Sequence, residues 1–434
     1  MPPHQSFTLA LPPPILRLPG NIIERITENL DTTSVSHLYQ TCHHMRSITA
    51  RSLYNTVELR PDRSMSFTIS ITNNFQLRKL VESLSVHDHH TIDTIYAESL
   101  GLVIPQLRNL KHLTIKGCYT STHGQFLGEQ MPQWTTLYLP PLQPTALTKL
   151  ESCNLSLSSV DSYDLSDRSI IFHHPTLRHL AILGCTLSNL PLYTDDLVHS
   201  TPLQTLALLC ADISAATLRK IVSLPRALTR FTMAGKRQLE KAEFTDTKHD
   251  LYIQALEVQK ASLVNIELGL WNFKYEHCAS FDLSEFAALE SFTITPLVLP
   301  PNYKATKQDE TVNGPRRSQF HNLTRLAPIP FPASLRDLTF FHIEHSTFKH
   351  VERVVLTQLA QLVSAEKLPN LRCITFATPI SSGEYEQADL DLPHGWENAF
   401  MGRVKVVRLA VHVMKQFPVR CACCDYKLGG WVVE

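Results

Sequence analysis

Apolar residues recur along most of this chain in one spacing, L-x-x-L-x-L, in which a leading leucine precedes two alternating apolar residues. The segment LRNLKHLTIKGC is the clearest example, with Leu110, Leu113 and Ile115 followed by Cys118. Residues two apart share one face of a strand, so Leu113 and Ile115 are expected to point into a common core. The pattern therefore predicts a short strand at each occurrence, with the leading leucine in the approach to it.

The same spacing returns through the rest of the chain, led by Leu177, Leu203, Leu228, Leu263, Leu289, Leu335 and Leu371. Weaker copies begin at Val81, Trp134 and Leu150. Several successive leading residues are 25 to 27 positions apart, which lies within the range of a strand-plus-helix repeat. Longer steps mark insertions, and the chief one, the polar segment at about 300–322, is expected to be a mobile surface loop.

This spacing resembles that of leucine-rich repeats. Helical patterns at 214–224 and 351–365 lie between predicted strands, and a strand followed by a helix in each unit builds a right-handed α/β solenoid. The predicted fold class is therefore α/β, with parallel strands on the concave face of an irregular horseshoe. The alternative is generic α/β packing with leucines placed by chance, which the near-regular period disfavours.

The N-terminal pattern is different and predicts three short helices. Ile22, Ile23, Ile26 and Leu30 recur at helical spacing, and Pro19 suits a first helical turn. The run DTTS at 31–34 offers caps for a second helix, and a third short segment ends before YNTVEL. Such a block is too small for a large core, so it should dock on the rest of the chain or present an apolar face to a partner.

Residues 16–60 resemble an F-box. The matching features are Leu18-Pro19, the isoleucine stripe, Leu38 with Cys42, and the closing Leu53-Tyr54. Two positions depart from the family pattern, because Asn21 stands where an acidic residue is frequent and Met45 where a tryptophan is frequent. The alternative is that these apolar residues form only the core of a helical cap on the repeat array.

The resemblance implies binding to the Skp adaptor, and through it to a cullin, in an SCF-type ubiquitin ligase. By position, the adaptor-facing residues would be Leu18, Pro19, Ile22, Ile23, Ile26, Leu30, Leu38 and Met45. An F-box followed by leucine-rich repeats is the layout of fungal-type substrate receptors, in which the repeat face holds a target protein. The alternative function is a leucine-rich interaction scaffold with no link to ubiquitination.

The expected organisation has four parts: a disordered tail at 1–15, the F-box at 16–60, the solenoid at 61–420 and a Cys-rich cap at 421–434. Target specificity is expected in solvent-facing residues beside the predicted strands, among them Lys111, His112, Arg178, His179, Gln204 and Arg336. The target itself, any requirement for its phosphorylation, and the number of repeats cannot be read from the sequence.

Composition and charge also narrow the expected partners and cellular location of the protein. Lys and Arg balance Asp and Glu at 40 each, which gives no bulk charge to attract nucleic acid. No apolar run reaches the roughly 18 residues of a membrane span, and the N-terminal segment lacks the basic start of a secretory signal. We therefore expect no nucleic-acid or membrane partner, reduced thiols, and a cytoplasmic or nuclear protein.

Motifs for catalysis or cofactors are missing from the sequence: it holds no phosphate-binding loop, dinucleotide fingerprint or nucleophile elbow. The histidines at 87–90 are expected in a surface turn, and those at 342–350 beside a repeat strand. Cys421, Cys423 and Cys424 could bind zinc with help from His412 or Cys373, could be redox-sensitive, or could simply cap the solenoid. The overall expectation is a non-catalytic adaptor without cofactor or metal.

Overall fold

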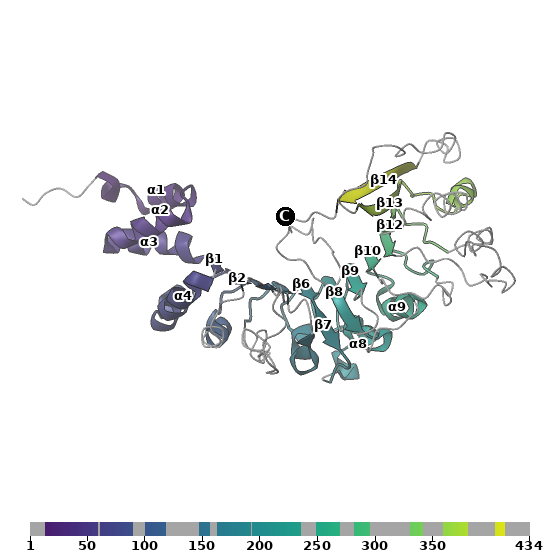
Figure 1. Cartoon of the computed structure of the whole chain (residues 1–434), viewed down its shortest axis with the longest axis horizontal. Coiled ribbons are helices and arrows are strands. Elements are labelled where there is room, and N and C mark those ends of the chain that lie inside the picture. Colours follow the sequence, from purple (N-terminus) through teal and green to yellow (C-terminus); the bar gives the residue numbers. More distant parts are fainter. Residues whose placement is uncertain are drawn as a thin grey trace, which may run out of the picture.

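A helical N-terminal block leads into one long, curved parallel sheet (Figure 1). The structure is a computed structural model that describes residues 14–59, 61–89, 100–118, 147–156, 163–191, 193–235, 249–269, 282–295, 330–341, 359–380 and 404–412. The tail at 1–13, the insertion at 300–322, the Trp134 segment, His342 to His350 and the cysteines at 421–424 lie outside the described residues.

The N-terminal block has the three helices that the sequence predicted. A 3-10 turn, η1 (Pro14–Arg17), precedes α1 (Gly20–Glu28), α2 (Thr32–Thr41) and α3 (His43–Tyr54). The chain then enters the sheet through β1 (Thr56–Leu59), followed by α4 (Pro61–Asn73) and α5 (Phe75–Arg78). The sheet therefore begins inside the range 16–60, and β1 joins the helical block directly to the repeat array.

The sheet itself consists of strands that follow one another in chain order, each parallel to the last. After β1 they are β2 (Ser83–His89), β3 (His112–Cys118), β4 (Ser152–Ser156), β6 (His179–Leu183), β8 (Thr205–Ile213), β9 (Arg230–Gly235), β10 (Asn265–Gly269), β11 (Ser291–Thr295), β12 (Asp337–Phe341), β13 (Cys373–Ile380) and β14 (Lys405–His412). The predicted α/β class is confirmed, because parallel strands in strict order need a crossover between each pair.

A small second ribbon branches from the middle of this sheet. The short strands β5 (Tyr163–Asp164) and β7 (Cys185–Leu187) pair with each other, and β7 also pairs with the end of β8. β8 is nine residues long and pairs in both sheets, and its register with β9 shifts between Leu209 and Ala211. At that irregularity Cys210 has a φ of 50°, in the left-handed region.

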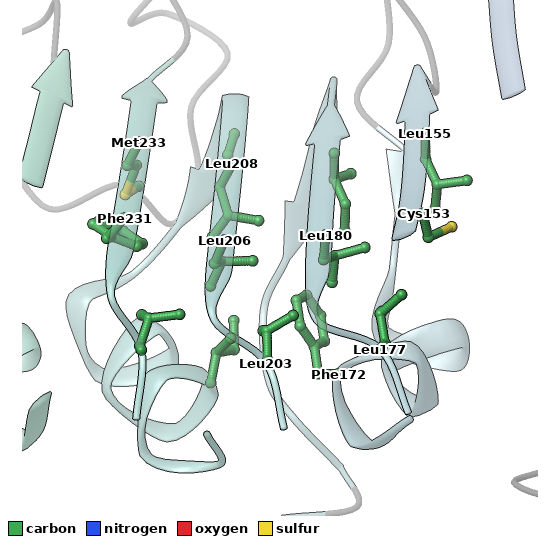
Figure 2. Packing of buried hydrophobic residues seen from close by; sticks show 14 of the residues in the cluster. Cys153, Leu155, Phe172, Leu177, Leu180, Leu203, Leu206, Leu208, Phe231 and Met233 are labelled. Carbon is green, nitrogen blue, oxygen red and sulfur yellow. The ribbon is translucent and has the colours of Figure 1, made fainter. Parts of the chain in front are cut away.

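The core consists of three rows of side chains that run across the strands (Figure 2). One row holds the first inward residue of each strand, with Leu113, Cys153 and Leu180 as register partners. A second row lies two positions later, and the leading leucines form the third below the strands. Leu110, Leu150, Leu228, Leu263, Leu289 and Leu335 in that third row are all fully buried, at 0 % exposure.

In several turns a polar residue precedes the leading leucine and ties that turn to the one before it. Thr176 Oγ1 donates a hydrogen bond to the Leu150 carbonyl at 2.8 Å, and Ser262 Oγ donates to the Leu228 carbonyl at 3.0 Å. The same position bonds the preceding turn at Asn109, Ser334 and Asn370. These side chains satisfy carbonyls that the sheet ladder leaves unpaired at the ends of the strands.

Short helices lie on the outer side of the curve and the strands line its inner side (Figure 1). The outer elements are η2 (Ile104–Gln106), η3 (Ser166–His173), η4 (Asp195–Leu197), α8 (Ala215–Ser223), α9 (His249–Leu256), η6 (Glu257–Gln259) and a helical segment at 359–364. The predicted helix at 214–224 is confirmed as α8, whose first turn is capped by Ser214 Oγ accepting from the Thr217 N–H at 3.1 Å. Of the helix predicted at 351–365, residues 359–364 are described and helical.

Several elements had no counterpart in the sequence prediction, among them β14 and α4. β14 pairs with β13 along its whole length, although the residue at its leading position is Arg403 instead of a leucine. α4 lies at the start of the range assigned to the solenoid, where no helix was predicted, and it buries Phe67 and Ile71 against the first strands. β2 also runs on through His89, so the histidines at 87–89 lie in a strand, where a turn was predicted.

Candidate functional site: an apolar helix face and a polar sheet face

Each helix of the N-terminal block contributes a large apolar residue to the interior of the block. Ile23 of α1, Val35 of α2 and Met45 of α3 are 1 %, 3 % and 2 % exposed. Beside them Thr27 Oγ1 lies 2.9 Å from Ser52 Oγ, a polar contact between α1 and α3. Ile23 and Met45, which the sequence placed against the adaptor, therefore pack inside the block and position the helices behind its surface.

The turn between α1 and α2 is fixed by Asp31, which caps α2. Its carboxylate accepts hydrogen bonds from the N–H groups of Thr33 at 2.9 Å and Ser34 at 3.0 Å, and from Ser34 Oγ at 2.7 Å. The Ser34 hydroxyl and backbone bonds lower the pKa of this carboxyl. A sharp, capped turn holds α1 at a defined angle across α3, which is a condition for presenting its outer side as a surface.

Large apolar side chains on α1 and in the segments directly before and after it are left exposed by the block. Ile15, Leu18, Ile22, Ile26 and Leu30 are each 38 to 39 % exposed. We call this set the α1 apolar face. Of the other residues predicted to contact the adaptor, Pro19 is exposed and Leu38 is half-buried.

Ile15 extends this face and was missed by the sequence prediction, which assigned it to the tail at 1–15. The residue lies in η1, whose turn is closed by a hydrogen bond from the Leu18 N–H to the Ile15 carbonyl at 3.3 Å. The spacing of Ile15 and Leu18, three residues apart, was the signal that could have found it.

The α1 apolar face is a candidate docking surface on energetic grounds. Single exposed apolar residues are ordinary on protein surfaces, whereas a contiguous row of large ones marks a binding site. Covering such a row gains about 25 cal/mol for each Å² of apolar surface removed from water. α1 thus has two apolar sides, of which one is used by the fold and the other is left for a partner.

The inner side of the sheet forms a second and very different surface. In the main-sheet strands from β2 to β13, one outward residue lies between the two inward positions, and these residues are small or polar: Ser85, Thr114, Asn154, Ala181, Ala207, Thr232, Glu267, Thr293, Thr339 and Thr375. Burial raises the pKa of the Glu267 carboxyl, which lies between the threonines of β9 and β11.

Charged residues cluster where the strands begin. Lys111 Nζ forms an ion pair with Glu82 at 2.8 Å, and Arg336 pairs with Glu290 at 3.1 Å, so two of the predicted specificity residues are engaged within the chain. His112, Arg178 and Gln204 are exposed, and His179 is half-buried. Of the predicted specificity residues, these are the ones open to a ligand.

Four basic residues gather on strands β3, β6 and β9. We call His112, Arg178, His179 and Arg230 the basic strip. Burial lowers the pKa of His179, and the positive charges of Arg178 and Arg230 lower it further. The negative charge of Glu151, on the turn before β4, raises the pKa of His179. Arg230 was not singled out from the sequence, because only the register of β8 with β9 brings it into line with His179.

Apart from these two surfaces, few features of the described residues indicate a binding or catalytic site. Among these residues, no group of three or more His, Cys, Asp or Glu side chains is placed to hold a metal ion. The helices of the described part of the chain are all too short or too polar to cross a membrane. Cys373 lies in β13 with its Sγ 3.6 Å from Thr375 Oγ1, and His412 ends β14.

Comparisons with known proteins add no family to this picture. No family model matches the chain, and no curated protein matches it. The functional argument therefore depends on the two surfaces described above.

Proposed function

We propose that this chain is the substrate-recognition subunit of an SCF-type E3 ubiquitin ligase, in which the N-terminal helices are an F-box and the curved sheet is a leucine-rich-repeat solenoid. The α1 apolar face would bind the Skp adaptor and link the chain to a cullin. The inner face of the sheet would hold a target protein. The observation that carries the proposal is the exposure of large apolar residues on and beside α1. Four of them, Leu18, Ile22, Ile26 and Leu30, stand at positions where the F-box resemblance places the adaptor.

The proposed mechanism requires no reacting group on this chain. A receptor that holds a target beside a ubiquitin-charged enzyme raises the local concentration of target lysines around the thioester. The direct path from α3 into β1 supports this role, because a rigid junction would keep the target in a fixed position relative to the scaffold.

The adaptor-binding face is tested by placing a charge in its centre. We expect Ile22→Asp or Ile26→Asp to weaken co-elution with the Skp adaptor at least about 100-fold, because each would bury an unpaired carboxylate in the interface. Adaptor binding would be measured by gel filtration of the coexpressed proteins and by calorimetry. The double variant is expected to show no detectable complex.

The matched control is Ile69→Asp, which makes the same substitution at a 49 % exposed isoleucine on α4, away from the α1 apolar face. Ile69→Asp should bind the adaptor as the unmodified chain does. If the unmodified chain fails to co-elute with the adaptor, or if the Ile22 and Ile26 variants bind normally, the F-box proposal is wrong. A leucine-rich interaction scaffold outside ubiquitination would then be the better description.

A further inference from the structure

In the basic strip the two arginines form no ion pair among the described residues, although Glu151 lies nearby. Elsewhere along the strand starts, Lys111 and Arg336 are paired with glutamates. Among the described residues, Arg178 and Arg230 form no ion pair or side-chain hydrogen bond, and both are exposed. Exposed cations that the fold leaves unpaired favour an anionic ligand.

The strip also has a definite length and direction. His112, His179 and Arg230 occupy the same register position on β3, β6 and β9, with β4 and β8 lying between them. Strands about 4.8 Å apart place the two ends of the strip roughly 19 Å apart. About six residues of extended chain cover that distance, so a short extended segment crossing the strands could contact every member.

The sheet surface along the basic strip allows a peptide backbone to approach closely. The residues between and beside the basic groups are small, among them Ser152, Ala181, Thr205 and Ala207. No aromatic side chain lies among these described positions, so bases of a nucleic acid would find nothing on which to stack. The absence of stacking groups favours an acidic peptide over a single-stranded nucleic acid.

The spacing of the cations indicates which kind of anion fits. A phosphate group is held by several donors that converge on one point. Here the basic groups lie on β3, β6 and β9, with β4 and β8 between them, which matches carboxylates spaced along an extended chain. The main opposing charge nearby is Glu151, which is exposed at the start of β4, and Glu267 lies beyond the strip on β10.

We propose that the sheet face from β3 to β9 binds an extended acidic segment of another protein, whose Asp and Glu side chains meet Arg178, Arg230 and His112. The identity of that protein as a ubiquitination target rests on the proposed function, whereas the binding itself does not. The inference specifies the chemistry of the target: a run of carboxylates in an extended region.

The test uses the full chain and a fluorescein-labelled peptide of about twelve residues with alternating Glu and Ala, measured by fluorescence anisotropy at low salt. We expect the peptide to bind and added salt to weaken it. Arg178→Glu and Arg230→Glu should each weaken binding about five- to tenfold, because each replaces an attraction with a repulsion. Arg219→Glu is the matched control, since Arg219 is exposed on α8 at the outer side of the same region.

Three results would overturn the proposal. The Glu-Ala peptide could fail to bind, or it could bind the Arg178 and Arg230 variants as well as it binds the Arg219 variant. A peptide with a single phosphoserine, or a thymidine oligonucleotide, could bind more tightly than the Glu-Ala peptide, which would assign the strip to a different ligand.

The same variants separate this proposal from the proposed function. Arg178→Glu and Arg230→Glu should retain full adaptor binding, because the basic strip and the α1 apolar face lie on different elements. If the adaptor never binds but the peptide binds as expected, the ligase role is wrong and the acidic-segment site stands. If the adaptor binds but the peptide does not, the acidic-segment proposal alone is wrong.

Discussion

Gln259 shows how one polar residue can hold two successive turns of this fold together. Its amide nitrogen donates to the carbonyls of Val222 at 2.9 Å and Pro225 at 2.8 Å. Its amide oxygen accepts from the Leu228 N–H at 3.0 Å and from Ser262 Oγ at 2.7 Å. The side chain is 3 % exposed, so all four bonds lie away from water. A buried amide with every group satisfied fixes the packing of its neighbours more tightly than an apolar residue would.

At the residue scale we expect Gln259→Leu to lower the free energy of unfolding by about 3 kcal/mol, because it leaves buried backbone groups without partners. The change would be measured by urea unfolding followed by circular dichroism. Gln254→Leu on the exposed side of α9 is the matched control and should change stability little. Equal effects at the two positions would show that the Gln259 bonds contribute nothing.

At the scale of single elements, the strands of this sheet are defined by their inward rows. Cys153 takes a place in β4 that leucine or isoleucine takes in the neighbouring strands, and it is 1 % exposed. A thiol is tolerated there because neutral cysteine packs as a small apolar side chain. Burial raises the pKa of Cys153 to about 12.

Because the Cys153 thiol is buried, we expect the folded state to lose stability at alkaline pH. The thiol of the unfolded chain ionises near its ordinary pKa of 9.0, while the folded chain keeps it neutral up to about 12. The folded state therefore loses stability as the pH rises from 9.0 toward 12, by about 2 kcal/mol at pH 10.5.

Cys153→Val should remove this loss, since valine suits a strand and does not ionise. The measurement is urea unfolding of both proteins at about pH 8 and about pH 10.5. We expect the stability of the unmodified chain to fall by about 2 kcal/mol more than that of the variant over this range. Parallel pH dependences would show that the Cys153 thiol does not titrate in this way.

At the scale of the whole molecule, each strand of the main sheet pairs with the strands of the turns directly before and after it. Stability in such an array is close to a sum of turn and nearest-neighbour terms, so the ends have fewer partners than the middle. The middle is reinforced further, because β8 pairs with β6, β9 and β7.

This arrangement predicts a gradient of amide protection, with the slowest hydrogen exchange in β6, β8 and β9 and faster exchange in β1 and β14. Exchange followed by mass spectrometry would map it on the unmodified chain. Uniform protection from β1 to β14 would instead indicate one cooperative unit and would contradict the nearest-neighbour description.

The repeat strands were predictable because their signal is local. Two apolar residues at alternate positions and a leucine three residues before them specify both the strand and its buried side, as at Leu177 and Leu180. β14 escaped prediction because it lacks the leading leucine and is recognised only by its pairing with β13. The ion pair of Lys111 with Glu82 could not be foreseen either, since its partners are 29 residues apart in the sequence.

The sequence by itself determined the element types, the order of the repeats and the apolar content of α1. Only the tertiary structure decided which side of α1 is buried, placing Ile23 inside and leaving Ile22 and Ile26 exposed. Likewise, only the strand register aligned Arg230 with His179. The reason is physical: periodicity depends on backbone geometry within one segment, whereas exposure and alignment depend on what other segments pack against it.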